Sequence, residues 1–389
     1  MKIRDRQFAN FFLLITLISF LVDLGQMKYS VALISALLLF VLLLRRKEFV
    51  FSENLLFLYE FKQLLMILFV FLTLTIIKQL IYGFNIYAIN ECIYYITPLF
   101  LVFFYVQFQK KPEDIFHIID IIFYIYITRF FLENWSILSL SGIKSISLRT
   151  SYSPYESGMA FVFCALSFYC LYRKDWKKGM ICVLFSYFTL KRVAFMATVA
   201  NLFFLFFWRH KKIYGRKVRK IYVYLSIIFF ILLPMIIPII LTYSFADSFY
   251  AITGFNISAF TKGRFERLIL VTNSNEINTG WGSVTTFLTD YLISYHKGTL
   301  KTNFNLHNDI YKIYLEMGFI GTAAFTISFF KLTRKNLVSF IFCFYLFTEM
   351  CVNHLMGAGS PSLWIIYYLL FFCFNSEQAI QNDNNAYLT

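Results

Sequence analysis

Long apolar segments separated by short basic loops are the feature that most limits what this chain can fold into. A membrane-spanning helix needs about 20 predominantly apolar residues. About twelve segments approach this pattern, near residues 8–25, 28–44, 63–82, 90–108, 114–132, 157–172, 177–190, 193–208, 221–243, 309–330, 337–353 and 361–374. The sequence therefore predicts an all-α polytopic integral membrane protein.

Composition supports a partnership with lipid rather than with nucleic acid. Of the 389 residues, 59% are hydrophobic and only 15% are charged, whereas a soluble domain of this length needs more polar surface. The 50 Phe and 27 Tyr residues suit lipid contact and interfacial belts. The net charge of +15 comes from short basic runs between apolar segments, so we expect a lipid bilayer as partner and no nucleic acid.

The distribution of basic residues predicts the topology. With the N-terminus in the cytoplasm, most Lys and Arg residues, including the cluster at 209–220, fall in short cytoplasmic loops. The first apolar segment has no convincing small-residue cleavage site and is interpreted as a retained span. We expect one transmembrane domain at 1–374 with a large outer loop at 244–308, and a cytoplasmic polar tail at 375–389.

The most distinctive polar site begins at His307, at the end of the outer loop. Asn308 is a good N-cap for the following helix and Asp309 suits its first turn, so His307 would lie beside the positive end of a helix dipole, which favours an anion. Asp309, Lys312 and Glu316 recur at helical spacing and share one face. Charged side chains inside a span normally face the bundle interior or a wet cavity. The alternative is a structural histidine in a loop.

Arginines predicted to face outward are candidates for phosphate binding. Arg192 follows Lys191 at the start of the eighth segment, and Arg264 and Arg267 would share a helix face. A guanidinium group binds phosphate with two parallel hydrogen bonds and stays charged at any working pH. The alternative is a set of ordinary solvated or interfacial arginines.

Two further outer residues are weaker candidates. Glu156, at the start of the sixth segment, could orient a hydroxyl group or pair with an arginine, or act only as a capping carboxylate. His354, in the last outer loop, could line the same cavity or have a plain loop role. The chain has no Asp-x-Asp pair, no His/Cys cluster with zinc spacing and no phosphate-binding P-loop, so we expect no metal site and no cofactor.

The segment that begins at His307 resembles a pattern of the O-antigen ligase and Wzy-type O-antigen polymerase superfamily. In that pattern His-Asn, nine residues, Gly, two residues and a small residue or Tyr follow a large periplasmic loop, as His307, Asn308, Gly318 and Gly321 do here. Small residues such as these glycines allow close helix contact. The resemblance covers about residues 150–325 and includes the segments Lys191-Arg192, Gly263-Arg264, Gly280-Trp281-Gly282 and, loosely, Ser153-Pro154-Tyr155-Glu156.

The resemblance implies a GT-C-like fold and a metal-independent glycosyltransferase of the bacterial inner membrane, with its site facing the periplasm. The donor would be an undecaprenyl-diphosphate-linked oligosaccharide, held by Arg192 and Arg264. His307 would act as general base towards the acceptor hydroxyl, or position it. A chain-length regulator protein is implied as a further partner. Additional substrate-binding residues would be Arg267, Glu156, Asn308 and Glu316.

An O-antigen polymerase, which joins repeat unit to repeat unit, is the preferred interpretation. The reason is that the chain is rich in Phe, Ile and Tyr and that its motifs diverge from the usual family sequences, as those of polymerases tend to do. A ligase, which transfers finished polymer to lipid A–core, would use the same site and stays an alternative. A lipid-linked oligosaccharide flippase or other transporter is the alternative from another class, but transporters often contain repeats, and none is visible here.

Overall fold

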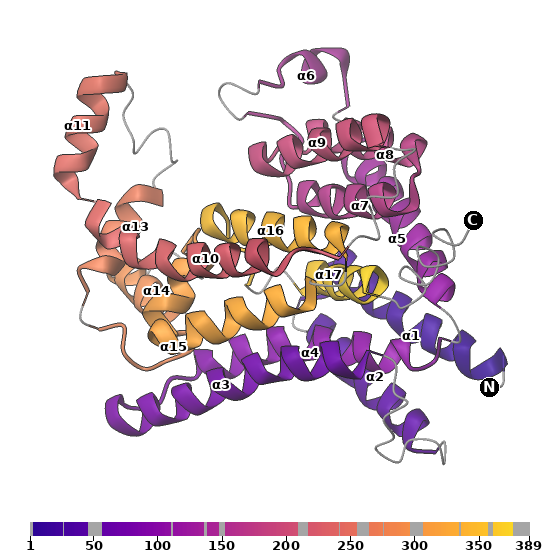
Figure 1. The fold of residues 1–389 in the computed structure, drawn as a ribbon, viewed down its shortest axis with the longest axis horizontal. Helices are drawn as coiled ribbons and strands as arrows, with labels where there is room; N and C mark the ends of the chain where they lie inside the picture. Colours follow the sequence, from indigo (N-terminus) through magenta and orange to yellow (C-terminus); the bar gives the residue numbers. More distant parts are fainter. Residues whose placement is uncertain are drawn as a thin grey trace.

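A computed structural model shows a helical bundle with one isolated β-bridge, Ser147–Tyr152, in the part of the chain that the structure describes (Figure 1). The described residues are 3–25, 27–45, 57–109, 112–135, 138–147, 152–208, 217–240, 242–254, 264–274, 276–295, 306–333, 336–356 and 361–375. The helices are α1 (Ile3–Leu21), α2 (Met27–Leu44), α3 (Leu58–Tyr82), α4 (Tyr87–Val106), α5 (Pro112–Asn134), α6 (Leu140–Lys144), α7 (Met159–Arg173), α8 (Trp176–Phe188), α9 (Arg192–Trp208), α10 (Lys220–Ile240), α11 (Tyr243–Thr253), α13 (Arg264–Thr272), α14 (Ser283–Tyr295), α15 (Asp309–Leu332), α16 (Leu337–Val352) and α17 (Pro361–Phe374).

Six of the described helices, α2, α3, α4, α5, α10 and α15, are long and apolar enough to cross a membrane. Their outer surfaces carry exposed apolar side chains, such as Phe69 and Leu80 on α3, which are 71% and 82% exposed. Such large apolar surfaces are suited to lipid rather than to water. The prediction of an all-α chain with several helices of membrane-spanning length is confirmed. The other six predicted segments form α1, α7, α8, α9, α16 and α17, which are shorter or more highly charged.

The centre of the bundle is α17, in which nearly every side chain is buried. Helices α4, α5 and α7 pack against it, while α15 packs against α3, α10 and α16. One core of buried apolar side chains runs through the bundle from α1 to α17. This core joins helices from the beginning and the end of the described chain.

Contacts between distant residues distinguish the two ends of the bundle. At one end, Arg6 near the start of α1 pairs with Asp114 near the start of α5 at 2.7 Å. The Tyr105 hydroxyl, near the end of α4, donates to Asn10 of α1. Phe103 of α4 stacks on Phe61 near the start of α3. Phe57, just before α3, therefore lies at this same end, where it stacks on Phe372 near the end of α17. The first turn of α1 and the last turn of α17 therefore share one end, and the opposite end, which carries the predicted outer loop, is termed the loop end.

The described residues of the predicted outer loop, 244–308, belong largely to helices α11, α13 and α14. Helix α11 projects away from the bundle, whereas α13 and α14 lie against the beginning of α15 (Figure 1). Apolar side chains of α13, α14 and α15 form a second, smaller core beneath them. Residues 255–263 and 296–305 of the loop, and 376–389 of the predicted tail, lie outside the described residues.

The turn Gly280-Trp281-Gly282 fastens α14 to the loop ends of α3 and α4. Both glycines have positive φ, 90° and 81°. A Cβ atom on Gly280 would lie 2.8 Å from the Cα of Thr75, and one on Gly282 would lie 2.9 Å from the backbone carbon of Tyr87. The backbone N–H of Trp281 also donates to Thr75 Oγ1 at 3.1 Å. Only glycine allows so close an approach with this backbone conformation.

Helix α15 is bent at Gly318, where φ is 67° and ψ is −167°. A Cβ atom at Gly318 would meet no atom within 4 Å, so the expectation of close helix packing is not met at this residue. The glycine is explained instead by its backbone conformation, which other residues rarely adopt. At Gly321 a Cβ would lie 2.1 Å from that of Met317, because the bend brings these turns together. The nine residues between Asn308 and Gly318 thus form the first straight part of α15.

Candidate functional site

His307 lies at the loop end, directly before α15. Asn308 has extended backbone angles, and its side chain accepts a hydrogen bond from the Tyr311 N–H at 2.9 Å, which confirms the predicted N-cap. Asp309 occupies the first turn, as predicted. The partly buried His307 ring therefore stands at the positive end of a helix, where an anion is stabilised.

Arg264 and Arg267 lie one turn apart at the start of α13. Arg264 Nη1 donates to the backbone carbonyl of Val352, the last residue of α16, at 2.6 Å. A cation is favourable at the C-terminal end of a helix, because carbonyl groups point towards it. This contact holds α13 against the end of α16.

A third group of charges comes from the connections around α7, α8 and α9. Arg192 is the first residue of α9, and the neighbouring Lys191 pairs with Glu156, with Nζ and Oε1 2.5 Å apart. The Ser157 N–H donates to the Thr189 carbonyl at 3.3 Å, which keeps the segment before α7 against the α8–α9 connection. Lys191 is thus an ion-pair partner of Glu156, and the Glu156 charge also acts on Arg264.

The electrostatic neighbours of Arg264 show that these groups converge. Burial lowers the pKa of Arg264 the most, and the positive charges of Arg267 and Arg192 lower it further. The carboxylates of Glu156 and Glu349 act in the opposite direction. Arg192 and Arg264, which lie about 70 residues apart in the chain, therefore share one electrostatic environment at the loop end.

His307 belongs to the same environment. Burial lowers its pKa from 6.5 to about 4, and the neighbouring Arg264, His354 and Arg267 contribute in the same direction. The ring is therefore uncharged at neutral pH and able to accept a proton or a hydrogen bond. Arg192, Arg264, Arg267 and His307 are together termed the arginine cluster.

Asp309 and His354, which lie 45 residues apart in the chain, form a pair that no sequence pattern predicted. His354 Nδ1 lies 2.7 Å from Asp309 Oδ1, and Asp309 Oδ2 accepts from the N–H groups of Leu355 and Met356. The other ring nitrogen, Nε2, is buried and bonds to no described residue. His354 is also an electrostatic neighbour of His307, so the suggestion that it lines the same site fits its position.

Glu316, predicted to bind substrate, lies deeper in the bundle and is 1% exposed. Its carboxylate accepts from the Val284 N–H at 3.0 Å and lies 4.0 Å from Lys312 Nζ. Lys312 in turn pairs with Glu91 of α4 at 2.5 Å. These contacts tie α15 to α4 and α14, so Glu316 has a clear structural role below the arginine cluster. Glu91, Lys312 and Glu316 are termed the buried ion cluster.

Within the described ranges, no three His, Cys, Asp or Glu side chains are grouped as metal ligands. Comparisons of the chain with protein-family models, with curated proteins and with solved structures found no match. The basis for a functional assignment is therefore the chemistry of the site.

Proposed function

We propose that this chain is a metal-independent glycosyltransferase, and specifically an O-antigen polymerase of the bacterial inner membrane. In this proposal α1–α5, α7–α10 and α15–α17 provide twelve spans of a GT-C-like fold. Both termini are cytoplasmic, and the arginine cluster faces the periplasm. The enzyme transfers undecaprenyl-diphosphate-linked glycan onto the next lipid-linked repeat unit.

The arginine cluster is the observation that carries the proposal. The guanidinium groups of Arg192, Arg264 and Arg267, with the Lys191 ammonium, are four positive charges. Among the described residues, the carboxylates that act on Arg264 and His307 are three, those of Glu156, Glu349 and Asp309. Like charges that are close together repel, so the arrangement is favourable when an anion lies between them. Arginine pairs suit a diphosphate because each planar group can donate two hydrogen bonds.

The chemistry follows from this arrangement. The acceptor hydroxyl oxygen attacks the anomeric carbon of the donor, and the bond between that carbon and the diphosphate oxygen breaks. Undecaprenyl diphosphate leaves as an anion, and the arginines stabilise the charge that develops on it. His307, uncharged at neutral pH, accepts the proton of the acceptor hydroxyl or positions that hydroxyl.

A bound diphosphate also makes His307 a better base. In the free protein the positive charges of Arg264 and Arg267 lower the pKa of the ring. A diphosphate between the arginines offsets these charges and raises that pKa towards its usual value. His307 therefore becomes basic when the donor is in place, which couples proton transfer to donor binding.

A lipid-linked oligosaccharide flippase is the second candidate, and the buried ion cluster is the observation in its favour. Charged side chains inside a membrane bundle often mark the path of a transported ion or substrate. In this chain, however, Lys312 bonds to Glu91, and Glu316 bonds to a backbone N–H. Because these charges are satisfied within the protein, we favour the enzyme.

The proposal is tested by replacing the arginine cluster in the producing strain. Arg192→Gln, Arg264→Gln and His307→Gln should each abolish long surface polysaccharide while the protein remains in the membrane. Arg129→Gln is the matched control, because Arg129 pairs with Glu133 on α5 and lies outside the cluster. Normal polymer from all three cluster variants would overturn the assignment.

A deletion strain separates the candidate functions. Lipopolysaccharide that carries a single repeat unit is the result expected for a polymerase. Bare core with polymer stored on the carrier lipid would identify a ligase. Repeat units that remain on carrier lipid at the cytoplasmic face would identify a flippase.

A further inference from the structure

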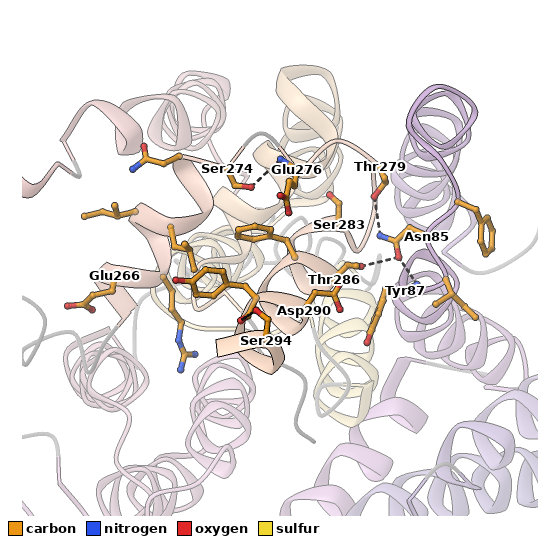
Figure 2. Close-up of a pocket in the computed structure, with 18 residues that line it drawn as sticks. Asn85, Tyr87, Glu266, Ser274, Glu276, Thr279, Ser283, Thr286, Asp290 and Ser294 are labelled. Atoms are coloured by element: carbon orange, nitrogen blue, oxygen red, sulfur yellow. Dashed lines mark hydrogen bonds between the residues drawn. The ribbon is translucent and has the colours of Figure 1, made fainter. Parts of the chain in front are cut away.

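A large groove lies beside the arginine cluster at the loop end. Its volume is about 1550 Å³, larger than the roughly 300–1,000 Å³ typical of small-molecule pockets. One wall is formed by α13 and α14, and the other by the connection between α3 and α4, where Asn85 lies (Figure 2). An elongated ligand suits this space better than a single small molecule.

One face of α14 supplies much of the lining. Ser283, Thr286, Phe287, Asp290, Tyr291 and Ser294 recur every three or four residues and therefore share that face. Hydroxyl, amide and carboxylate groups can donate or accept hydrogen bonds, and aromatic rings present flat apolar faces. This mixture matches a sugar, which has hydroxyl groups at its edge and C–H groups on its faces.

Hydrogen bonds hold some polar groups of the groove in place, and one lining hydroxyl has no partner among the described residues. Asn85 Nδ2 donates to Thr279 Oγ1 at 3.1 Å, and Asn85 Oδ1 accepts from Thr286 Oγ1 at 3.0 Å (Figure 2). Ser283 is 2% exposed and lines the groove, and its buried hydroxyl bonds to no described residue. A buried hydroxyl without a partner is costly, so a ligand that bonds to Ser283 would be stabilised.

Arg267 connects the groove to the arginine cluster. Its side chain lines the groove, and its charge also acts on Arg264 and His307. A glycan whose diphosphate lies in the cluster would therefore enter the groove as it extends.

The charge of the lining predicts which sugars fit. Among the described residues that line the groove, Glu266, Glu276 and Asp290 are acidic and only Arg267 is basic. This negative excess is unusual in a chain with a net charge of +15. Carboxylates repel acidic sugars and accept hydrogen bonds from hydroxyl or amine groups. Neutral and amine-bearing sugars are therefore favoured.

We infer that this groove holds the growing glycan as an extended chain of neutral or amine-bearing sugars. The inference rests on the proposed polymerase function and adds a binding site to it. Contacts along the groove should strengthen as the chain lengthens, because a longer glycan reaches more of the lining. The groove then favours, as donors, chains that have already begun, which are transferred onto the next repeat unit.

Binding without turnover tests the groove directly. The probe is surface polysaccharide from the producing strain, cut into fragments of one to several repeat units and freed of lipid and phosphate. Purified protein should bind longer fragments more tightly. Tyr291→Ala and Asp290→Ala should each weaken binding about tenfold, equivalent to about 1.4 kcal/mol. Oligogalacturonate, an oligomer of acidic sugars, should not compete with the fragments for binding at an equal concentration, because the carboxylates of the groove repel it.

Matched controls come from α11, which does not line the groove. Tyr250→Ala and Asp247→Ala remove the same side chains from exposed positions and should leave binding unchanged. Equal loss in groove and control variants, absence of fragment binding, or competition by the acidic oligomer would each overturn the inference.

Chain length in the producing strain separates this inference from the function on which it rests. Tyr291→Ala and Asp290→Ala should shorten the modal polysaccharide while first linkages still form. Unchanged chain length in these variants, with no polymer in Arg264→Gln, would overturn the groove and leave the polymerase standing. Normal polymer in Arg264→Gln, Arg192→Gln and His307→Gln would overturn the polymerase and the groove together.

Discussion

His354 and Asp309 form a buried hydrogen-bonded pair, with Nδ1 and Oδ1 2.7 Å apart. Asp309 opens α15, and His354 follows the end of α16, so the pair joins the two helices beside His307. The Asp309 carboxylate also accepts two backbone N–H groups just after His354. It therefore fixes both the imidazole and the segment that carries it.

Asp309→Asn should destabilise the protein and reduce its activity. The substitution keeps the size of the side chain but removes a charge whose hydrogen bonds contribute about 1.5–3 kcal/mol each. We expect a loss of at least about 2 kcal/mol in the free energy of unfolding, measured by denaturant titration in detergent. Asp247→Asn, on the exposed face of α11, is the control and should have little effect. Equal stability of the two variants would contradict this role for Asp309.

The depressed pKa of His307 predicts a pH dependence of stability. The folded-state pKa is about 4, whereas the ordinary value is 6.5, so the unfolded chain binds more protons between these pH values. Stability should therefore be full above about pH 6.5 and fall as the pH drops towards about 4. His307→Gln should flatten this part of the curve, measured as unfolding midpoint against pH. The exposed His117→Gln should leave it unchanged, and an unaltered slope in His307→Gln would exclude burial of a neutral ring.

Pyrophosphate should raise the pKa of His307. Burial lowers this pKa the most in the free protein, and anionic charge in the arginine cluster offsets the further lowering by the positive charges of Arg264 and Arg267. Titration of the His307 ring by NMR, with and without inorganic pyrophosphate, measures the shift. Arg264→Gln should also raise the pKa without ligand and should weaken the response to pyrophosphate. If the pKa of His307 is the same with and without pyrophosphate, the anion does not bind in the arginine cluster.

Local signals in the sequence were sufficient for the positions of the long apolar helices and for the cap at Asn308, but not for α6, α11, α13 and α14 in the predicted outer segments. A helix is selected by apolar content, and an N-cap needs only one side chain and the next turn. The sequence pattern that begins at His307 singles out Gly318 and Gly321. Their different structural roles became clear only from the backbone angles and the neighbouring atoms in the structure. Gly318 has a positive φ and open space around it, whereas Gly321 lies against Met317.

Pairings between distant segments could not be predicted in the same way. His354 and Asp309 lie on different helices, and Lys312 meets Glu91 across more than 200 residues. A charged residue inside an apolar segment predicts that an oppositely charged partner lies nearby, but the sequence contains several carboxylates that could be that partner. Which one it meets depends on helix packing, which neither composition nor periodicity specifies.

Removing the cation of the buried ion cluster should strongly destabilise the folded protein. Lys312→Met leaves Glu91 and Glu316 buried without their partner, and breaking a buried pair costs about 3–5 kcal/mol. Lys331→Met, at an exposed position of the same helix, is the control. Adding Glu91→Gln to Lys312→Met should recover part of the loss, because one unpaired charge is removed. Unfolding in detergent measures all of these variants, and equal stability of the two lysine variants would show that the cluster contributes little.

Gly318→Ala tests whether the bend in α15 positions the site. An alanine at φ 67° and ψ −167° is strained, at a cost of order 1–3 kcal/mol, although there is free space for its methyl group. If α15 straightens to relieve the strain, Asp309 moves relative to His354, and polymer synthesis should fall along with the unfolding midpoint. Gly158→Ala is the matched control, since its φ of −64° suits alanine and its surroundings are open. Full activity and stability in Gly318→Ala would show that the bend is dispensable.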